Sequence, residues 1–332
     1  MRRLLQFFKN LFVHTEEQRT SSSVEPSEPS EEKQMPSEKP ELPRLDAAVS
    51  YNGQNVPIFA PNGFPPSFAD TLNDFEAGTE DFAFEVGRVQ QEMGIGVDGF
   101  CGPTTIQKMA EKDRDEQEVS SGIFIGPRCY EIENSNVRTF ADEEALAGLK
   151  GRRRSQAISQ LVLHYDVTFS SESTISVLRQ RGLSYHFLVD GDDEATIFQL
   201  SNPTLNVAFH AGPVNNYSLG ICLNNPAEPK YQNHDAHRRG RKREILADRI
   251  HGSTVKLLEF FPEQIDAANE LGDVLCESLG IRRRVPKDEK GNTVKTVVDD
   301  IAFAGVVGHY HVSKSKIDPA PLDWDQLTFA VE

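Results

Sequence analysis

Between about residues 68 and 112, apolar side chains recur at the three- and four-residue spacing of a helix. They are Phe82, Val86, Val89 and Met93. Gly94 follows where such a helix would stop, and Asp98-Gly99 predicts a turn. Gly102-Pro103 then places a proline at the first position of a second helix. The pattern predicts a small all-helical unit over 68–112, with a plain helical hairpin as the alternative.

Residues 151–332 have a different pattern, in which short apolar runs and turns alternate with helical stretches. The runs that predict strands are 158–165, 185–189, 195–200, 219–223 and 302–307. Residues 171–181 have helical character, with Ser171 as the predicted cap. A long helix carries an apolar stripe and ends at Gly280, and the stripe consists of Ala268, Leu271, Leu275 and Leu279. This pattern predicts an α/β domain.

The remaining segments lack such periodicity. Residues 15–67 begin with a stretch rich in Ser, Glu and Pro, which cannot bury enough apolar surface to offset its ordering entropy. We therefore expect a disordered linker over 15–67 and a charged connector over 113–150. Residues 1–14 place Leu and Phe on one helical face and basic residues on another, which predicts an amphipathic helix able to lie on an anionic membrane. A frayed or partner-docked terminal helix is the alternative.

Charge and composition exclude several classes of protein. The formal net charge of -16 argues against broad nucleic-acid binding, which needs a basic face. No apolar stretch is long enough to span a bilayer, and no clear signal peptide is present, so we expect synthesis in the cytoplasm. The scattered cysteines form no CxxC pair, which favours free thiols.

Candidate metal ligands stand where predicted strands end. His164 closes the run 158–165, His309 follows an apolar run, and Asp318 lies nine residues further on. Two imidazoles and a carboxylate suit a catalytic zinc site, because three protein ligands leave a fourth position for water. Each residue also has a structural interpretation: a histidine at a strand end is often a packing residue, and Asp-Pro can simply start a turn. His311 competes with His309 for the same role.

Five blocks in this region carry a resemblance when they are taken together. They read LVLHYDVT, SYHFLVDGDDEATIFQL, AFHAG, NNYSLGICLNN and VVGHYHVSKSKIDP. Their order and approximate spacing resemble the zinc-dependent N-acetylmuramoyl-L-alanine amidase family, which includes phage amidase-type lysozymes, bacterial amidases and animal peptidoglycan-recognition proteins. The resemblance implies a mixed central sheet flanked by helices, with zinc (Zn²⁺) as the cofactor and peptidoglycan as the substrate.

The resemblance also implies roles for individual residues. The family's zinc ligands map onto His164, His309 and Asp318. Lys316 corresponds to a lysine beside the metal that can stabilise an oxyanion, and Tyr185 to a tyrosine beside the zinc-bound water. His210 and Asn215 correspond to positions that line the substrate groove, with a turn histidine and a turn-capping asparagine as the alternatives.

Cys222 is a departure from the pattern of bacterial members with an aspartate ligand, which usually carry glutamate as general base at this position. A free thiol, with a pKa of about 8.5, is a poor substitute. We therefore expect Tyr185 and Lys316 to handle protons and Cys222 to be a small buried strand residue, with a nucleophilic cysteine as the alternative.

Two further segments bear on the substrate. The loop 97–105, which reads VDGFCGPTT, resembles the VDGxxGxxT hallmark of peptidoglycan-binding domains, so residues 68–112 are expected to bind the polymer. Between 225 and 259 the chain is longer than the family pattern and contains the basic run 237–243. That run is interpreted as a solvated loop or as a contact with the anionic wall.

These observations predict a zinc-dependent enzyme, domain 151–332, that hydrolyses the amide between N-acetylmuramic acid and L-alanine. A non-catalytic peptidoglycan-recognition protein is the alternative, and a membrane-associated scaffold using residues 1–14 is a third hypothesis. The enzyme is expected to act at the bacterial cell wall or periplasm, as an endolysin or another phage-delivered hydrolase would.

Overall fold

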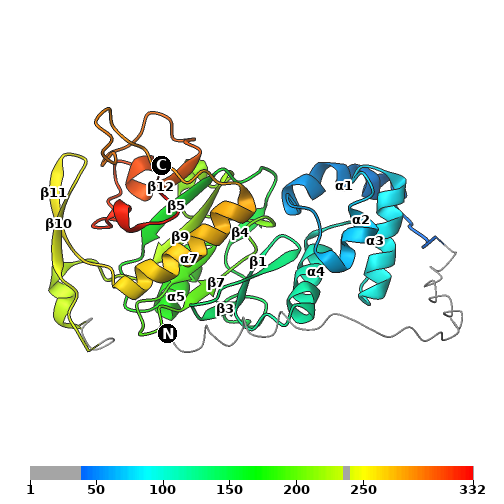
Figure 1. Ribbon diagram of the computed structural model, residues 1–332, viewed down its shortest axis with the longest axis horizontal. Coiled ribbons are helices and arrows are strands. Elements are labelled where there is room, and N and C mark those ends of the chain that lie inside the picture. Colours follow the sequence, from blue (N-terminus) through cyan, green and yellow to red (C-terminus); the bar gives the residue numbers. More distant parts are fainter. Residues whose placement is uncertain (1–38, 235–239, 332) are drawn as a thin grey trace, which may run out of the picture. The chain divides into compact units, whose positions relative to one another are not determined.

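Short apolar strands build a six-stranded mixed sheet, in the order β12-β5-β9-β6-β7-β3 (Figure 1). The computed structural model describes residues 39–234 and 240–331. The central pairs β12/β5, β5/β9 and β9/β6 are parallel, β6/β7 is antiparallel, and β7/β3 is parallel. The strands are β3 (Val137–Thr139), β5 (Gln160–Tyr165), β6 (Phe187–Val189), β7 (Ile197–Gln199), β9 (Ser218–Leu223) and β12 (Gly305–Gly308). The predicted mixed sheet flanked by helices is thus confirmed.

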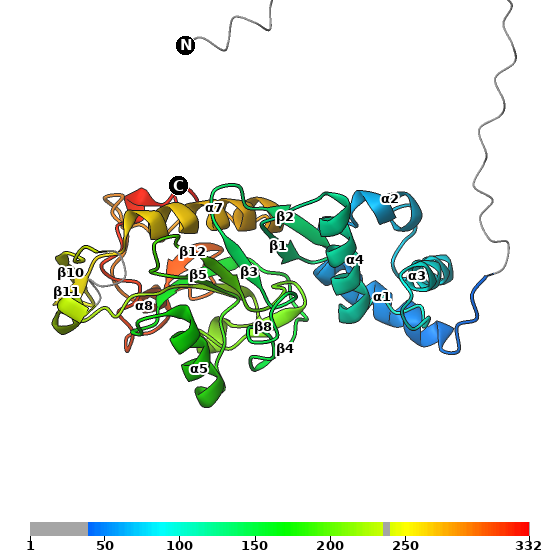
Figure 2. The same cartoon turned by 90° about the horizontal axis from the view of Figure 1, so that it is seen from below.

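The two faces of the sheet are covered by different helices. Figure 2 shows α7 (Pro262–Leu279) on one side of the strands and α5 (Ser171–Arg181) on the other. Successive strand residues point to opposite faces, so Leu161 and Leu163 of β5 pack in the same cluster as Leu271 of α7. The alternate residues, including His164, face the α5 side. His164 therefore points away from the face that supplies most of the core.

Both helices were predicted, with a one-residue error at one cap. The helix α5 spans the predicted residues, but its N-cap is Ser170, whose Oγ accepts a hydrogen bond from the Ser173 N–H at 3.1 Å. The predicted cap, Ser171, is instead the first helical residue, and its N–H donates to the Asp190 carboxylate at 3.1 Å. Gly280 ends α7 in the left-handed conformation, with φ 63°.

Residues before the sheet form a helical unit, made of α1 (Leu45–Phe59), α2 (Pro66–Leu72), α3 (Glu80–Glu92) and α4 (Pro103–Glu116). The linker predicted over 15–67 is therefore wrong for the part that forms α1. Asn52 occupies a core position of α1, where its side chain bonds to Gly99 O and to Cys101 N, both at 2.8 Å. The turn formers Gly53 and Pro57 inside α1 are the reason that the sequence pattern does not predict this helix.

The loop between α3 and α4 is fixed by one buried glutamine. Gln90 accepts hydrogen bonds from the N–H groups of Asp98 and Gly99, both at 2.9 Å, and donates to the Asp98 carboxylate at 2.7 Å. Gly99 has φ 74°, and a Cβ there would lie 2.9 Å from Leu42 Cδ1. The Asp98-Gly99 pair of the VDG motif is therefore required by a tight turn that packs against the helices.

The predicted connector 113–150 is part of the fold rather than a separate segment. It contains the hairpin β1 (Gly122–Ile125) and β2 (Arg128–Glu131), followed by β3 at the sheet edge. Gln199 of β7 holds this hairpin, since its amide bonds to Phe124 N at 2.8 Å and to Phe124 O at 2.7 Å. Side chains between elements, which a linear pattern does not display, attach this segment to the sheet.

Two smaller strand pairs complete the structure. β4 (Gly151–Arg153) pairs with β8 (Asn206–Ala208), and the long segment after residue 225 forms the hairpin β10 (Ile245–Ile250) and β11 (Ser253–Leu258). Of the basic run 237–243, Arg243 is buried and stacks on Phe261 at 3.9 Å, so it belongs to the core. Short helical turns are η1 (Gly212–Val214), η2 (Pro229–Tyr231), α8 (His309–Val312) and η3 (Trp324–Gln326).

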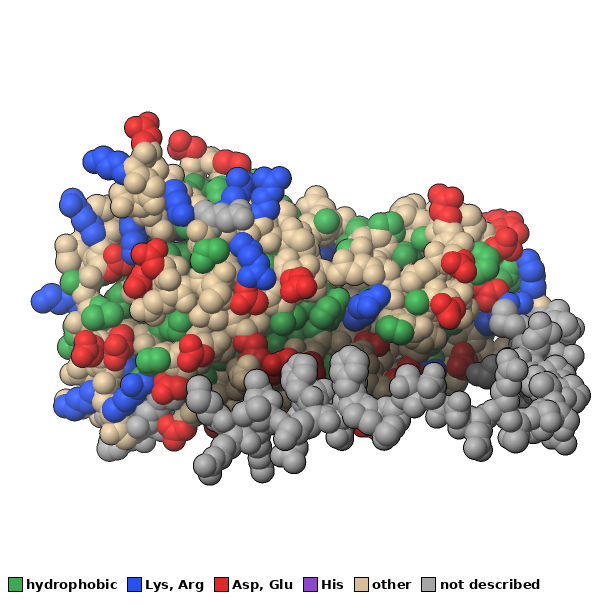
Figure 3. Space-filling model, in the orientation of Figure 1, with side chains coloured by type: hydrophobic (Ala, Val, Ile, Leu, Met, Phe, Trp, Pro, Cys, Tyr) green, Lys and Arg blue, Asp and Glu red, His purple; other side chains and the backbone are tan. Residues whose placement is uncertain are grey.

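The surface drawn in Figure 3 intersperses acidic and basic side chains. Within residues 39–234 and 240–331, no helix is long and apolar enough to cross a membrane. The predicted helix 1–14 and the first part of the predicted linker, up to residue 38, lie outside the described residues.

Candidate metal centre

Three of the predicted ligands converge at one end of two neighbouring parallel strands. His164 is near the end of β5, and His309 directly follows β12, whose Gly308 pairs with Leu163. Asp318 lies in the following loop, where its carbonyl oxygen accepts a hydrogen bond from Tyr310 N at 3.0 Å. A Cβ on Gly308 would stand 2.6 Å from Pro319, so glycine lets this loop approach the strand. All three ligand side chains are buried.

The donor atoms of these residues form a nearly equilateral triangle. His164 Nδ1 lies 3.0 Å from His309 Nδ1 and 3.1 Å from Asp318 Oδ2, and His309 Nδ1 lies 2.9 Å from the same oxygen. Protons alone cannot satisfy all three contacts, because two N–H groups that both pointed at the carboxylate would face each other. One cation bonded to all three atoms removes this conflict. Nitrogen and oxygen donors at this spacing suit a zinc ion, whose bonds to them are about 2.0–2.2 Å long.

The protonation states of two ligands suit a cation. Burial, with help from His309, lowers the pKa of His164 to about 4, so its ring is neutral at pH 7 and has a lone pair to donate. Burial of Asp318 opposes ionisation, but its contacts with His164 and His309 outweigh that effect and hold the pKa of the carboxyl well below its usual range. A neutral imidazole and an anionic carboxylate are the forms in which these groups bind a metal.

A chain of hydrogen bonds orients His164 from behind. Its Nε2 lies 3.0 Å from His210 Nδ1, and His210 Nε2 lies 3.2 Å from Ser218 Oγ, which donates to Val214 O at 2.8 Å. If Nδ1 of His164 is directed at a cation, its proton is on Nε2 and is donated to His210 Nδ1. Nε2 of His210 then donates to Ser218 Oγ, so each group in the series has one donor and one acceptor. His210 therefore supports the first ligand, and both of its ring nitrogens have partners.

The close approach of His210 explains why position 220, in the SLGIC block, is a glycine. A Cβ at Gly220 would lie 2.8 Å from both Cγ and Nδ1 of His210, closer than real contacts allow. The imidazole of His210 thus packs directly on the backbone of β9. Asn215 holds the same loop, because its Oδ1 accepts from His210 N at 3.2 Å and from Ala211 N at 2.7 Å. This contact is the predicted turn-capping alternative for Asn215, and the substrate contacts of His210 and Asn215 stay predictions.

Tyr185 and Cys222 border the metal triangle. The Tyr185 ring centroid lies 4.9 Å from that of His164, and Cys222 is paired with His164 across β5 and β9. Cys222 is fully buried in a cluster with Leu188 and Leu178. Burial raises the pKa of the Cys222 thiol and of the Tyr185 hydroxyl well above their usual values, so both keep their protons at neutral pH. Cys222 thus has the environment of a packing residue.

Lys316 is exposed beside the triangle, and its charge contributes to lowering the pKa of His164. Its backbone carbonyl lies 2.8 Å from Nε2 of His251, at the tip of the β10–β11 hairpin. His251 N in turn donates to Lys295 O at 2.9 Å. The inserted hairpin therefore contacts the loop that carries Lys316 and Asp318. Sequence reasoning missed His251, because nothing in the spacing of that segment indicates a distant contact.

His311, the rival of His309, lies outside the triangle. Its Nδ1 accepts a hydrogen bond from Gly308 N at 2.9 Å, and its Nε2 contacts Val294 O at 2.5 Å. Burial lowers the pKa of His311 to about 4. Both ring nitrogens are used to fix the turn after β12, so His311 has the structural role that was the alternative for each histidine.

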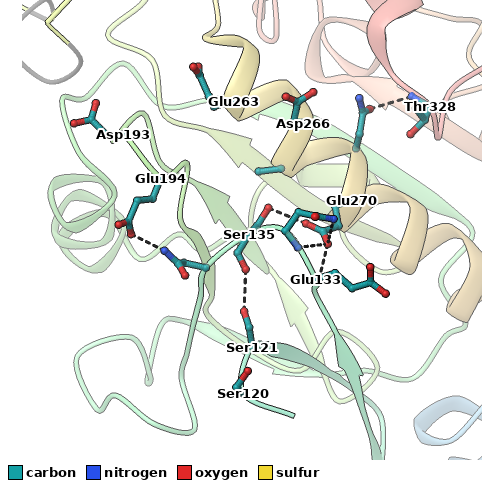
Figure 4. Close-up of a pocket in the computed structure, with 14 residues that line it drawn as sticks. Ser120, Ser121, Glu133, Ser135, Asp193, Glu194, Glu263, Asp266, Glu270 and Thr328 are labelled. Carbon is teal, nitrogen blue, oxygen red and sulfur yellow. Dashed lines mark hydrogen bonds between the residues drawn. The ribbon is translucent and has the colours of Figure 1, made fainter. Parts of the chain in front are cut away.

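A cavity of about 960 Å³ lies against α7 and is rich in carboxylates (Figure 4). Glu270 is used internally there, since it accepts hydrogen bonds from Glu133 N at 2.6 Å, Asn134 N at 2.8 Å and Ser135 Oγ at 2.8 Å. None of the predicted site residues lines this cavity. Its acidic lining does not suit an anionic polymer such as the cell wall.

The three residues of the metal triangle lie in the part of the chain that matches a known protein family. The family described as N-acetylmuramoyl-L-alanine amidase matches residues 154–321, half of the chain. No curated protein matches the chain. Similar solved structures include AmpDH3 from Pseudomonas aeruginosa in complex with anhydromuramic pentapeptide (19% identity, 52% of this chain and 58% of that chain, TM-score 0.35).

Two other solved structures are similar over comparable stretches. The amidase AmiD from E. coli shares 23% identity over 53% of this chain and 59% of its own (TM-score 0.33). The Ph2119 endolysin from a Thermus scotoductus bacteriophage shares 15% over 57% of this chain and 95% of its own (TM-score 0.32). This chain therefore spans less than two thirds of the length of AmpDH3 and AmiD. From the family match, which contains all three ligands of the triangle, the chain belongs to the N-acetylmuramoyl-L-alanine amidase family.

Proposed function

We propose that this protein is a zinc-dependent N-acetylmuramoyl-L-alanine amidase, which hydrolyses the amide between the lactyl group of N-acetylmuramic acid and L-alanine in peptidoglycan. The observation that carries the proposal is the triangle of His164 Nδ1, His309 Nδ1 and Asp318 Oδ2, whose sides are 2.9–3.1 Å. Membership of the amidase family supports the class of bond and substrate.

His164, His309 and Asp318 would hold the ion. Zinc bound by three protein ligands supplies a water whose pKa falls towards about 7, and such a water can attack an unactivated amide. The protein's own part is to keep these ligands in place. His210 and Ser218 orient the ring of His164, and the loop contact from Tyr310 N holds Asp318.

The neighbouring residues act on the substrate. Lys316 carries a positive charge at the exposed edge of the site, where it can stabilise the oxyanion that develops on the amide carbonyl. Tyr185 keeps its proton at neutral pH because burial raises its pKa, so it acts as a hydrogen-bond donor beside His164. Cys222 has no part in proton transfer, because its buried thiol is protonated as well.

The helical unit adds a means of holding a polymer. We propose that residues 68–112, together with α1, bind peptidoglycan and so raise the local concentration of substrate at the metal centre. The enzyme would act at the bacterial cell wall, with an endolysin-type or phage-delivered role as one setting.

A non-catalytic peptidoglycan-recognition protein is a second candidate, and one observation favours it. Cys222 occupies the position opposite His164 where a carboxylate base would serve catalysis, and its raised pKa leaves it unable to accept a proton. Against this candidate, a protein that only binds has no need of a three-ligand metal site next to a lysine.

Mass spectrometry of digested cell-wall sacculi distinguishes these functions. The zinc-loaded full-length protein is expected to release stem peptides with new free amino groups on L-alanine, and a chelator should abolish the release. New reducing sugar ends would indicate a glycosidase instead. Binding to sacculi without any zinc-dependent release would leave the recognition protein as the better description.

A further inference from the structure

A cleft of about 590 Å³ lies between α1, the VDG loop and the end of β4. Its lining combines guanidinium groups, aromatic rings and side-chain amides, and includes Arg44, Tyr51, Gln54, Asn55, Phe100 and Arg153. Every lining residue is neutral or basic. We call it the guanidinium cleft. It differs in charge from the acidic cavity beside α7, and it shares no residue with the metal triangle.

Two arginines and two aromatic rings of the guanidinium cleft form a continuous row. The guanidinium of Arg153 lies 4.3 Å from the Tyr51 ring centroid, and that of Arg44 lies 5.4 Å from the Phe100 centroid. The two rings meet edge to face, with centroids 5.2 Å apart. The rings thus hold the guanidinium groups by their faces, and the row presents charge rather than open aromatic surface.

Neither cation of this row has an acidic partner among residues 39–234 and 240–331. Asp98 is the acidic residue whose charge helps to raise the pKa of Tyr51, after burial as the main cause. Its carboxylate accepts hydrogen bonds from Gln90 Nε2 at 2.7 Å and from Phe100 N at 2.9 Å. Five other arginines of the described chain pair with carboxylates, namely Arg88, Arg114, Arg138, Arg241 and Arg283, and others, such as Arg128, Arg179 and Arg249, donate to backbone carbonyls. With a net charge of -16, two arginines in one cleft without an acidic partner among the described residues indicate a site for an external anion.

The row is held in place by buried contacts on both sides. On α1, Asn52 next to Tyr51 bonds to both Gly99 and Cys101, which fixes Phe100 between them. Next to Arg153, the buried Arg154 donates to Pro203 O at 2.6 Å, Asn216 O at 2.7 Å and Ser218 O at 3.0 Å. A site that is rigid before binding loses little entropy when a ligand arrives.

The same contacts connect the guanidinium cleft to the metal centre. Arg154 bonds to the backbone of Ser218, whose side chain bonds to His210 behind the first ligand. β4 also pairs with β8, which leads directly into the loop of His210. One rigid segment therefore carries a residue of the cleft and the support of His164.

We propose that the guanidinium cleft binds carboxylates of the stem peptides on a neighbouring part of the peptidoglycan strand, while another stem peptide is cleaved at the metal centre. The planar guanidinium matches a carboxylate in a two-bond geometry. Because both rings already hold arginines, the cleft recognises charge on the peptide rather than the faces of the sugars. This inference rests on the proposed function, and it makes the amidase domain contribute Arg153 to polymer binding.

Co-sedimentation of the full-length protein with purified sacculi, in the presence of a chelator to prevent hydrolysis, tests the inference. The double variant Arg44→Gln/Arg153→Gln is expected to bind roughly tenfold more weakly or worse, because two charge-assisted contacts are lost. A control, Arg282→Gln/Lys256→Gln, removes the same charge from exposed positions elsewhere and should bind as the unmodified protein does.

Chemically altered sacculi test the chemistry of the ligand. When their carboxyl groups are converted to amides with carbodiimide and methylamine, binding of the unmodified protein should fall to the level of the double variant. Undiminished binding would show that the carboxylates are not recognised and would overturn the assignment. Equal binding of the double variant and the unmodified protein to native sacculi would overturn the cleft itself.

Two further measurements separate this inference from folding defects and from the proposed function. Thermal unfolding shows whether the double variant folds; if it does not, Arg44→Gln alone, at an exposed position, is the test. Zinc-dependent hydrolysis of a soluble muramoyl tripeptide by the unmodified protein tests the proposed function separately from polymer binding. Loss of this hydrolysis in the unmodified protein would contradict the proposed function while leaving the sedimentation result standing.

Discussion

The metal triangle and the guanidinium cleft are polar sites built in opposite ways. In the triangle, the donor atoms of buried side chains lie within 3.1 Å of one another, and a hydrogen bond to His210 orients the ring of His164 from behind. In the cleft, two exposed arginines lie on aromatic rings and have no acidic partner among the described residues. The triangle suits a small ion and a reaction, whereas the cleft suits a large anionic ligand held by its charges. Substitutions in the triangle should therefore affect hydrolysis, and substitutions in the cleft should affect binding of the polymer.

The largest effect is expected from Asp318→Asn. The amide supplies a weaker donor and no negative charge, so the protein should lose bound zinc and its hydrolysis of soluble and polymeric substrates should fall about 10³-fold or more. Zinc content by mass spectrometry and turnover of a soluble muramoyl tripeptide measure both. Asp325→Asn, at an exposed position in the same C-terminal segment, is the control. A zinc-loaded, active Asp318→Asn protein would contradict the metal triangle.

A smaller effect is expected when the support behind the triangle is disturbed. In Gly220→Ala, the added Cβ would meet His210 at 2.8 Å and displace it from His164. Loss of such a supporting contact commonly lowers metal affinity or activity about 10–100-fold. Zinc affinity measured by competition with a chelator is the readout. Gly96→Ala, where a Cβ meets nothing within 4 Å, should leave affinity unchanged, and equal affinities for both variants would remove His210 from the proposed role.

The pH dependence of stability should distinguish the buried histidines from the exposed cleft. His186 is buried, accepts from Gly220 N at 3.0 Å and contacts Asn206 O at 3.1 Å. Burial, aided by Arg154, lowers its pKa to about 3, below the 6.5 of an unfolded chain. Between these values the unfolded state binds the extra proton, so stability falls as pH decreases, with a slope of about 1.4 kcal/mol per pH unit from this residue.

Urea unfolding of the metal-free protein between pH 4 and 6 measures that slope. His186→Gln should lower the slope of the unfolding free energy against pH by about 1.4 kcal/mol per pH unit, which corresponds to one proton, whatever the substitution does to stability at pH 7. Arg44→Gln at the cleft should leave the slope as it is, because it removes no buried titrating group. An identical slope in His186→Gln and the unmodified protein would contradict the burial of a neutral His186.

The triangle was predictable because its residues stand at the ends of elements. The strand ends indicated His164 and His309 as candidates, and the family resemblance of the five blocks selected them as ligands; the parallel pairing of β12 with β5 is what brings them together in the structure. Between His309 and His311, spacing alone did not decide and the resemblance selected His309; in the structure, contacts with Gly308 and Val294 hold His311 away from the triangle. The Val294 contact comes from a segment with no pattern of its own.

The cleft could not be predicted, for a related physical reason. Its first wall is α1, whose interior contains the turn formers Gly53 and Pro57, so the sequence pattern predicts a linker there. Its second wall is Arg153, which in the sequence is one of several arginines in a basic cluster. Tertiary contacts alone place Tyr51 beneath that guanidinium. Sequence patterns indicate which residues are buried in regular elements, but they do not show which exposed cations lack a partner.

The smallest effect is expected at the contact between the inserted hairpin and the loop of Lys316. His251→Ala removes the side chain that lies 2.8 Å from Lys316 O, so the loop loses one restraint while the zinc ligands stay in place. Turnover should fall about threefold to tenfold, less than the roughly 10²-fold reached when a reacting group moves by 1 Å. His251→Gln can still donate to that carbonyl and should have the turnover of the unmodified protein. Thr254→Ala, at an exposed position on the same hairpin, should also leave turnover unchanged. If zinc content fell together with turnover, the hairpin would stabilise the triangle itself rather than position Lys316.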